Sequence, residues 1–122
     1  MTTLNYFKNE PNAQEIKAGE TIFDQGELAD VMYVVREGEV DIVVGDKVVE
    51  KVGVGGIFGE MALIDNSPRS ASCVARTDCK IIPVNQHWFV YMVQETPYFA
   101  LQVMGIMAER LRRTSSALSV NQ

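Results

Sequence analysis

The sequence has few of the residues from which catalytic and metal sites are usually built. Its 122 residues include one histidine, His87, and two cysteines, Cys73 and Cys79. A metal site in a small β-barrel enzyme needs several such ligands, and nucleophilic catalysis needs a nucleophile paired with a base. The sequence suggests neither arrangement. We therefore expect a protein that is not an enzyme and uses no metal or other cofactor, with His87 as a surface or packing residue.

Positive charge is also scarce. The sequence contains eleven lysines and arginines and sixteen acidic residues, which gives a net charge of −5 and an isoelectric point of about 4.8. Such a surface does not favour DNA or RNA, so we expect no nucleic-acid contact by this chain itself. It also repels anions in general, and any anion that binds therefore needs a local, preorganised site.

Long apolar runs are absent, and no stretch reaches the ~18 apolar residues that could span a bilayer. No charged-then-apolar segment typical of a secretory signal opens the chain. The two cysteines could face each other across a tight turn, but thiols stay reduced in the cytoplasm. We therefore expect a cytoplasmic protein with free, mostly buried cysteines and no membrane contact.

What the sequence contains instead is a series of short segments that favour β-strands. They are rich in β-branched and aromatic residues, and glycine or aspartate lies in several of the turns between them. This pattern predicts a β-roll or jelly-roll barrel over about residues 12–84, with a β-sandwich as the alternative. The expected strands are Ala13–Ile16, Thr21–Phe23, Val31–Arg36, Val40–Val44, Lys47–Val52, Ser70–Ala75 and Cys79–Val84.

The last third of the chain has helical character, and one further helical turn is expected within residues 4–9. Asn85 is a suitable N-cap for a helix through Gln94, in which Trp88, Phe89 and Met92 have the spacing of core residues. Pro97 starts a second helix that reaches about Leu118. Its apolar residues recur every three or four positions and form one stripe: Leu101, Met104, Met107 or Ala108, Leu111 and Leu118.

We expect these two helices, at about residues 85–118, to pack on the barrel and close its mouth. The apolar stripe of the second helix is equally consistent with a homodimer seam. The whole chain, residues 1–122, is then a single mainly β domain with flanking helices, which suits its length.

One segment, IFGEMALIDNSPRSAS at residues 57–72, has the features of a ligand site. Gly59 lets the backbone approach a ligand, and the helical turn that follows offers free N–H groups to an anion. Glu60 only accepts hydrogen bonds when it is ionised, so its expected partner is a hydroxyl group such as that of a sugar. Arg69 offers a planar fork for two phosphate oxygens.

Ser70 adds a hydroxyl group beside Arg69, and Ala71 is small enough for its N–H to be approached closely. An acid for a ribose and an arginine for a phosphate make a site of nucleotide size. The alternative is that Glu60 and Arg69 form only a surface ion pair that caps a short helix.

The two halves of this segment, Phe58-Gly59-Glu60-Met61-Ala62-Leu63 and Pro68-Arg69-Ser70-Ala71-Ser72, resemble the phosphate-binding cassette of cyclic nucleotide-binding domains. This family includes sensor domains of the catabolite activator protein and of the cAMP-dependent kinase regulatory subunit. Residues 23–27 and 32–40 resemble its two glycine-centred turns before the cassette. The similarity continues into the two helices and covers nearly the whole chain.

The resemblance implies a β-roll that holds a 3′,5′-cyclic nucleotide. Glu60 and the N–H of Gly59 would bind the ribose 2′-hydroxyl. Arg69 would pair with the cyclic phosphate, helped by Ser70 and by the N–H groups of Ala62 and Ala71. Apolar side chains would line the sugar and base at Met61, Val48, Val52 and Ile57. The final helix would act as a lid, with base contacts from Arg110, Thr114 and Ser115.

The expected function is therefore that of a cyclic nucleotide-binding regulatory module that signals to an unknown effector protein by movement of its C-terminal helices. Serine at position 70 favours cAMP, with cGMP possible, because threonine there is the more usual sign of cGMP preference in the family. Two alternatives are the sensor half of a DNA-binding transcription regulator and a degenerate domain that only mediates interactions. No helix-turn-helix pattern follows the last helix, so we expect the output to lie in another chain or in a longer form of this protein.

Overall fold

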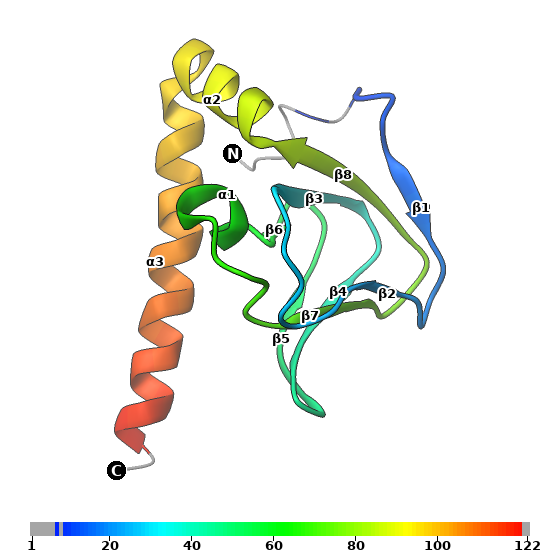
Figure 1. The fold of residues 1–122 in the computed structure, drawn as a ribbon, viewed down its shortest axis with the longest axis vertical. Coiled ribbons are helices and arrows are strands. Elements are labelled where there is room, and N and C mark those ends of the chain that lie inside the picture. The colour runs from blue at the N-terminus through cyan, green and yellow to red at the C-terminus, as the bar shows by residue number, and fades with distance from the viewer. Residues whose placement is uncertain (1–6, 8, 121–122) are drawn as a thin grey trace.

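The computed structural model describes residue 7 and residues 9–120, with side chains described as far as residue 113. This part of the chain contains eight strands and three helices (Figure 1). The strands are β1 (Gln14–Ile16), β2 (Thr21–Phe23), β3 (Val31–Glu37), β4 (Val40–Val44), β5 (Lys47–Val52), β6 (Ile57–Phe58), β7 (Ser72–Ala75) and β8 (Cys79–Asn85). The helices are α1 (Met61–Asp65), α2 (Gln86–Glu95) and α3 (Pro97–Val120).

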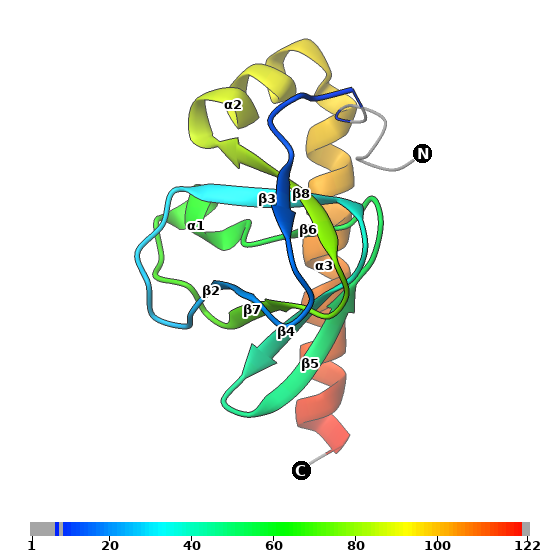
Figure 2. The ribbon, with the colours of Figure 1, turned by 90° about the vertical axis from the view of Figure 1, so that its right-hand side faces the viewer.

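The strands form two four-stranded antiparallel sheets, with the orders β1-β8-β3-β6 and β2-β7-β4-β5. Figure 2 shows the two sheets one above the other, with α2 at one end and α3 passing alongside both. The predicted mainly β architecture with C-terminal helices is confirmed. Closure of the sheets into a barrel, and of its mouth by the helices, stays a prediction.

All seven predicted strands are present, and three of them, β2, β4 and β5, have the predicted bounds. The strand that sequence reasoning missed is β6, whose two residues pair with Tyr33 and Val34 of β3. A strand of two residues has no periodicity to detect, and only its pairing with β3 defines it. The predicted helical turn at residues 4–9 falls largely outside the described residues.

The core has two clusters of buried side chains. One lies within the β part and includes Phe23, Val40, Val52, Phe58 and Cys73. The other joins the first sheet to the helices and includes Phe7, Met32, Ile57, Phe99 and Val103. Each fully buried apolar side chain contributes about 1.5–3 kcal/mol of transfer free energy, so these clusters hold the two sheets and the helices in one unit.

Helix α2 begins as predicted. The side chain of Asn85 accepts a hydrogen bond from the backbone N–H of Trp88 at 2.8 Å, which makes Asn85 the N-cap. Met92 is buried, and Trp88 and Phe89 pack against the same core cluster, as their spacing predicted. His87 lies exposed on the helix surface.

The predicted apolar stripe of α3 is wrong about which face packs on the sheets. Phe99 and Val103 are buried there, whereas Leu101, Met104 and Leu111 are 58–68% exposed. Two adjacent stripes satisfy the same helical period, with Met107 of the predicted stripe also packing against the core, and the sequence pattern does not choose between them. The choice is made by Phe99, whose ring meets those of Phe7 and Phe89 edge to face.

None of the described helices combines the length and the hydropathy needed to cross a membrane.

Candidate functional site

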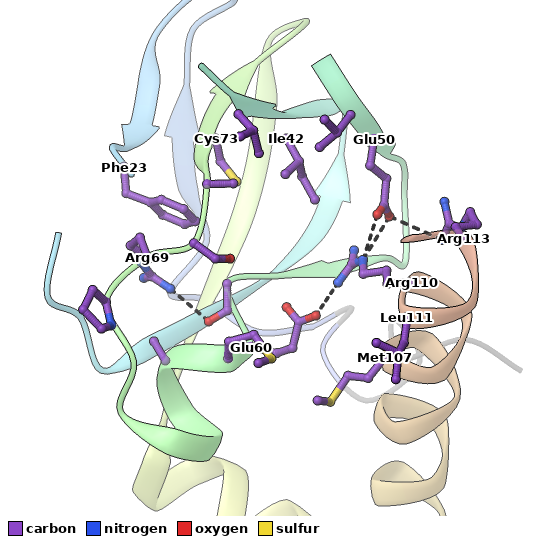
Figure 3. Close-up of a pocket in the computed structure, with 18 of the residues that line it drawn as sticks. Phe23, Ile42, Glu50, Glu60, Arg69, Cys73, Met107, Arg110, Leu111 and Arg113 are labelled. Carbon is purple, nitrogen blue, oxygen red and sulfur yellow. Dashed lines mark hydrogen bonds and ion pairs between the residues drawn. The ribbon is translucent and has the colours of Figure 1, made fainter. Parts of the chain in front are cut away.

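A cavity of about 780 Å³ lies between the second sheet, the α1 turn and α3. Eight of the residues predicted from the sequence line it together, seven from the segment 59–71 and one from α3: Gly59, Glu60, Met61, Ala62, Arg69, Ser70, Ala71 and Arg110. Figure 3 shows Arg69 at one end of this cavity, Glu60 in the middle, and Glu50, Arg110 and Arg113 at the other end.

Arg69 is buried, with 5% of its surface exposed. One terminal nitrogen donates to the carbonyl of Gly59 and the other to the carbonyl of Val31, each at 2.9 Å. The guanidinium carbon lies 3.9 Å from the centroid of the Phe23 ring, a cation–π contact. The remaining nitrogen, Nε, is buried without a hydrogen-bond partner. A buried donor left unpaired is unfavourable, and because Arg69 is one of the residues that line the cavity, its guanidinium suits an anionic ligand there.

The loop that carries Arg69 is held in place by its backbone. The N–H of Arg69 donates to the carbonyl of Glu27, and the N–H of Gly26 donates to the carbonyl of Arg69, both at 2.8 Å. Burial lowers the pKa of the Arg69 guanidinium, while nearby groups such as Tyr33 oppose this effect. Its backbone and terminal nitrogens together hold Arg69 in a fixed position in the site.

Glu60 is also buried, at 6% exposure, and stands at the N-terminus of α1. Its Oε1 pairs with a terminal nitrogen of Arg110 on α3 at 2.5 Å. The alternative of a surface ion pair between Glu60 and Arg69 is therefore wrong, because both side chains are buried and Glu60 pairs with Arg110 instead.

Arg110 is bound from three sides. Besides Glu60, its Nε donates to both carboxylate oxygens of Glu50 at 3.0 and 3.1 Å, and its second terminal nitrogen donates to the carbonyl of Ile57. Burial acts to lower the pKa of Arg110, but the two carboxylates outweigh it and raise the pKa. Arg110 thus connects α3 to β5 and to the α1 turn.

Gly59 is required by its surroundings. Its φ of +77° favours glycine, and a Cβ there would lie 2.6 Å from a terminal nitrogen of Arg69 and 3.3 Å from the Phe23 ring. The glycine predicted to allow close approach to a ligand therefore also leaves room for the arginine of the site.

The structure does not place three of the predicted lining residues at the cavity. Val52 and Ile57 are buried in the core clusters, and Val48 is 46% exposed. Val48 points away from the cavity because β5 is irregular. Ile42 pairs with Glu50 and Val43 with Val48, which leaves Val49 as an extra residue. Such an insertion reverses the side on which the preceding residues point.

Other lining residues were not found from the sequence. They include Phe23, Ile42, Val44, Val49, Glu50, Cys73, Met107, Leu111 and Arg113. An acid near the middle of an otherwise valine-rich strand was the available signal for Glu50. The predicted base contacts Thr114 and Ser115 have side chains outside the described part of the chain.

The lining carries three arginines and two glutamates, so the cavity has an excess of one positive charge within a chain of net charge −5. The thiol of Cys73 adds no charge, because burial raises its pKa to about 12. Both cysteines are free and buried, as predicted. A singly charged anion of nucleotide size fits this balance.

A family model for the cyclic nucleotide-binding domain matches residues 13–96. These residues are more than half of the chain, and they contain the α1 turn, Arg69 and both sheets. The chain therefore belongs to the cyclic nucleotide-binding domain family.

Three solved structures illustrate the similarity. The catabolite activator protein of Thermus thermophilus matches with a TM-score of 0.78 and 29% identity, over 89% of this chain and 55% of that one. The cAMP-bound form of the EAL enzyme Bd1971 matches with a TM-score of 0.62 and 29% identity, over 88% and 30%. A protein of a cyclic-GMP-dependent signalling pathway that regulates bacterial phytopathogenesis matches with a TM-score of 0.68 and 26% identity, over 85% and 84%.

This chain spans about half the length of the Thermus protein and about a third of the EAL enzyme.

Proposed function

We propose that this cyclic nucleotide-binding domain is a cAMP sensor that binds its ligand without chemical change. The observation that carries the proposal is the buried guanidinium of Arg69, a residue in the lining of a net positive cavity, whose Nε has no hydrogen-bond partner. A cyclic phosphodiester has one negative charge and two exposed oxygens. The guanidinium can meet them with Nε and with the hydrogens of its terminal nitrogens that the carbonyls of Gly59 and Val31 do not take. Ser70 and the N–H groups of Ala62 and Ala71 complete the phosphate end of the site.

The order of side chains across the cavity sets the orientation of the ligand. With the phosphate at Arg69, the ribose lies at Glu60, whose carboxylate accepts a hydrogen bond from the 2′-hydroxyl. The base then extends toward Glu50, Arg110 and α3 (Figure 3). Serine at position 70 and the cAMP-bound state of the similar EAL enzyme support cAMP as the ligand. The similarity to a protein of a cyclic-GMP pathway makes cGMP the first competitor to test.

The signal leaves the site through α3. Arg110 joins this helix to Glu60, the residue that meets the ribose, and to Glu50 on β5. A ligand that hydrogen-bonds to Glu60 changes the partners of Arg110, and it shifts the position of α3 by as much as its affinities for the two positions differ. The movement is then passed to an effector protein in the cytoplasm, where the two free thiols stay reduced.

The exposed stripe of α3 is proposed as a homodimer seam. Leu101, Met104 and Leu111 lie at three- and seven-residue steps and are 58–68% exposed. Apolar residues at this spacing pair helices into coiled coils, because burial removes them from water. In such a dimer, the α3 helices of the two copies would pair with each other, and each helix would remain connected to its own nucleotide site.

A second candidate is the sensor half of a DNA-binding regulator. It is supported by the similarity to the longer catabolite activator protein of Thermus thermophilus. The same nucleotide site and the same α3 would serve both outputs, and they differ only in what α3 is connected to.

Calorimetric titration with cAMP, cGMP and AMP tests the proposal. We expect cAMP to bind most tightly and AMP most weakly, because the dianionic open phosphate does not match a site with one excess positive charge. Chromatography after prolonged incubation should recover cAMP unchanged. Failure to bind any cyclic nucleotide would identify the chain as a degenerate, non-binding member of the family.

Hydrogen exchange tests the helix movement. The amides from Glu109 to Ser116 should exchange more slowly with cAMP than without it, because docking of α3 protects them. Equal exchange rates in the two states would exclude this part of α3 as the moving element.

A further inference from the structure

Glu50 is a carboxylate at the far end of the cavity from the phosphate fork. It comes from β5, it lines the cavity, and 17% of its side chain is exposed. Arg110 binds both of its oxygens through Nε, and Arg113 lies 3.7 Å from Oε2. These contacts hold the acid in one orientation and offset its charge, so burial there is tolerated.

The surroundings of Glu50 are those of a base rather than of a sugar or a phosphate. Besides Arg110 and Arg113, the cavity lining contains the apolar side chains Ile42 and Val49 from the sheet and Met107 and Leu111 from α3. Apolar side chains suit the faces of a purine ring. A single acid among them suits a polar group at the edge of the ring.

We infer that Glu50 selects the base of the bound nucleotide by accepting a hydrogen bond from the exocyclic amino group of adenine. This inference rests on the proposed function. An ionised carboxylate has about four lone-pair sites and no hydrogen to donate. Arg110 Nε takes one acceptor site on each oxygen and Arg113 lies 3.7 Å from Oε2, so these contacts leave acceptor capacity on Glu50.

The chemistry predicts which bases are rejected. Hypoxanthine presents a carbonyl oxygen where adenine has its amino group, so the carboxylate can accept a hydrogen bond only from the neighbouring N1–H, and only if the ring shifts so that the carbonyl oxygen no longer faces the acid. Unsubstituted purine has neither group and would leave the acid without its additional hydrogen bond. Since hydrogen bonds to charged groups are among the stronger ones, each change should weaken binding by about tenfold or more.

The pairing of β5 with β4 is what brings Glu50 to this position. The extra residue Val49 is followed by Glu50, which pairs with Ile42 of β4 and shares its side of the strand with the core residue Val52. The sheet therefore presents an acid on the side that also carries Ile42 of β4 and Val52 of β5.

Calorimetric titration of three ligands separates this role from a structural one. The ligands are cAMP, cIMP and the 3′,5′-cyclic monophosphate of purine riboside, which share the sugar and the phosphate. The wild-type protein should bind cAMP about tenfold or more tightly than the other two. In Glu50→Gln, the side-chain amide can donate to the hypoxanthine oxygen, so the ratio between cAMP and cIMP should fall toward one. Glu109→Gln, an exposed acid of α3 outside the cavity lining, is the matched control and should keep the wild-type ratio.

The outcomes are distinct. If Glu50 acted only by positioning Arg110 and Glu60, Glu50→Gln would weaken all three ligands by one common factor, and the inference would be overturned. Equal affinities of the wild-type protein for the three ligands would overturn it as well, while leaving cyclic nucleotide binding intact. Absence of binding by all three would contradict the proposed function itself.

Discussion

The carboxylate of Glu60 and the guanidinium of Arg110 form a largely buried ion pair at 2.5 Å, although the two residues are 50 positions apart in the chain. Glu60 stands at the start of a helix of five residues, and Arg110 lies on the long helix that follows the sheets. Removal of one partner of such a pair leaves an uncompensated buried charge. The contact therefore ties the position of α3 to the residue that we expect to meet the ribose.

Arg69 should dominate the affinity for the cyclic phosphate. Because charge-assisted hydrogen bonds contribute about 1.5–3 kcal/mol, Arg69→Ala should weaken cAMP binding at least about tenfold in calorimetric titration. Arg69→Lys should also lose affinity, since a single ammonium group cannot replace the fork. Arg76→Ala, an exposed arginine paired with Asp41, is the control. Wild-type affinity in both Arg69 variants would remove Arg69 from the site.

Glu60 should distinguish ribose from deoxyribose. The 2′-deoxy analogue of cAMP lacks the hydroxyl group that donates to the carboxylate, so it should bind the wild-type protein clearly more weakly. In Glu60→Gln the gap between the two ligands should shrink, because the acceptor has lost its charge. A deoxy analogue that binds the wild-type protein as tightly as cAMP would refute this role.

Gly59→Ala should impair binding more than folding. A left-handed residue other than glycine is strained by about 1–2 kcal/mol, and denaturant unfolding should detect a loss of this order. The added Cβ also meets the end of the Arg69 side chain at 2.6 Å and would displace it.

Gly19→Ala is the matched control for this variant. Gly19 has a φ of +89°, but a Cβ added there would have no neighbour within 4 Å, so only the backbone strain applies. We expect comparable destabilisation in both variants and a loss of cAMP affinity in Gly59→Ala alone. Equal affinities would show that the close approach to Arg69 has no consequence for binding.

Cys73 should make the protein less stable in alkaline solution. Burial raises the pKa of its thiol from 9.0 to about 12, so the unfolded chain releases this proton before the folded one does. Above about pH 9 the folded state is therefore progressively disfavoured, by about 1.4 kcal/mol at pH 10. The raised pKa of Tyr33, caused first by burial, acts in the same direction.

The measurement is the free energy of unfolding at pH 8 and at pH 10 for the wild-type protein and for Cys73→Ala. The decrease between the two pH values should be smaller in the variant by about 1.4 kcal/mol, whatever its stability at pH 8. An unchanged decrease would mean that Cys73 titrates normally in the folded protein.

The exposed stripe of α3 should control the oligomeric state. Leu101→Glu combined with Met104→Glu would place two charges in the proposed seam, and sedimentation should then report a monomer where the wild-type protein is a dimer. Leu28→Glu changes a leucine that is 82% exposed in the loop between β2 and β3, and it should leave the dimer intact. A monomeric wild-type protein would contradict the seam.

Much of this protein is determined by local sequence. Strands were predictable because segments rich in β-branched residues are separated by turn residues. The hairpin of β4 and β5 is an example, and the observed bounds of both strands match the predicted ones. The N-cap Asn85 acts on an N–H three residues away, so its role is also visible in the chain itself. The cassette from Gly59 to Ala71 is contiguous, and its residues line one cavity because a short turn and a backbone-held loop fold them together.

Tertiary structure decided what depends on distant partners. Helix α3 offers two apolar stripes, and the packing of Phe99 on Phe7 selected the one that is buried. One extra residue in β5 turned Val48 away from the cavity, and the pairing of Glu50 with Ile42 placed Glu50 in its lining. Glu60 pairs with Arg110 rather than with Arg69, which is nearer in the sequence, because α3 passes beside the α1 turn. Local periodicity specifies an element, but the choice of a face, a register or a charge partner follows from contacts between elements, whose energies are absent from any single segment.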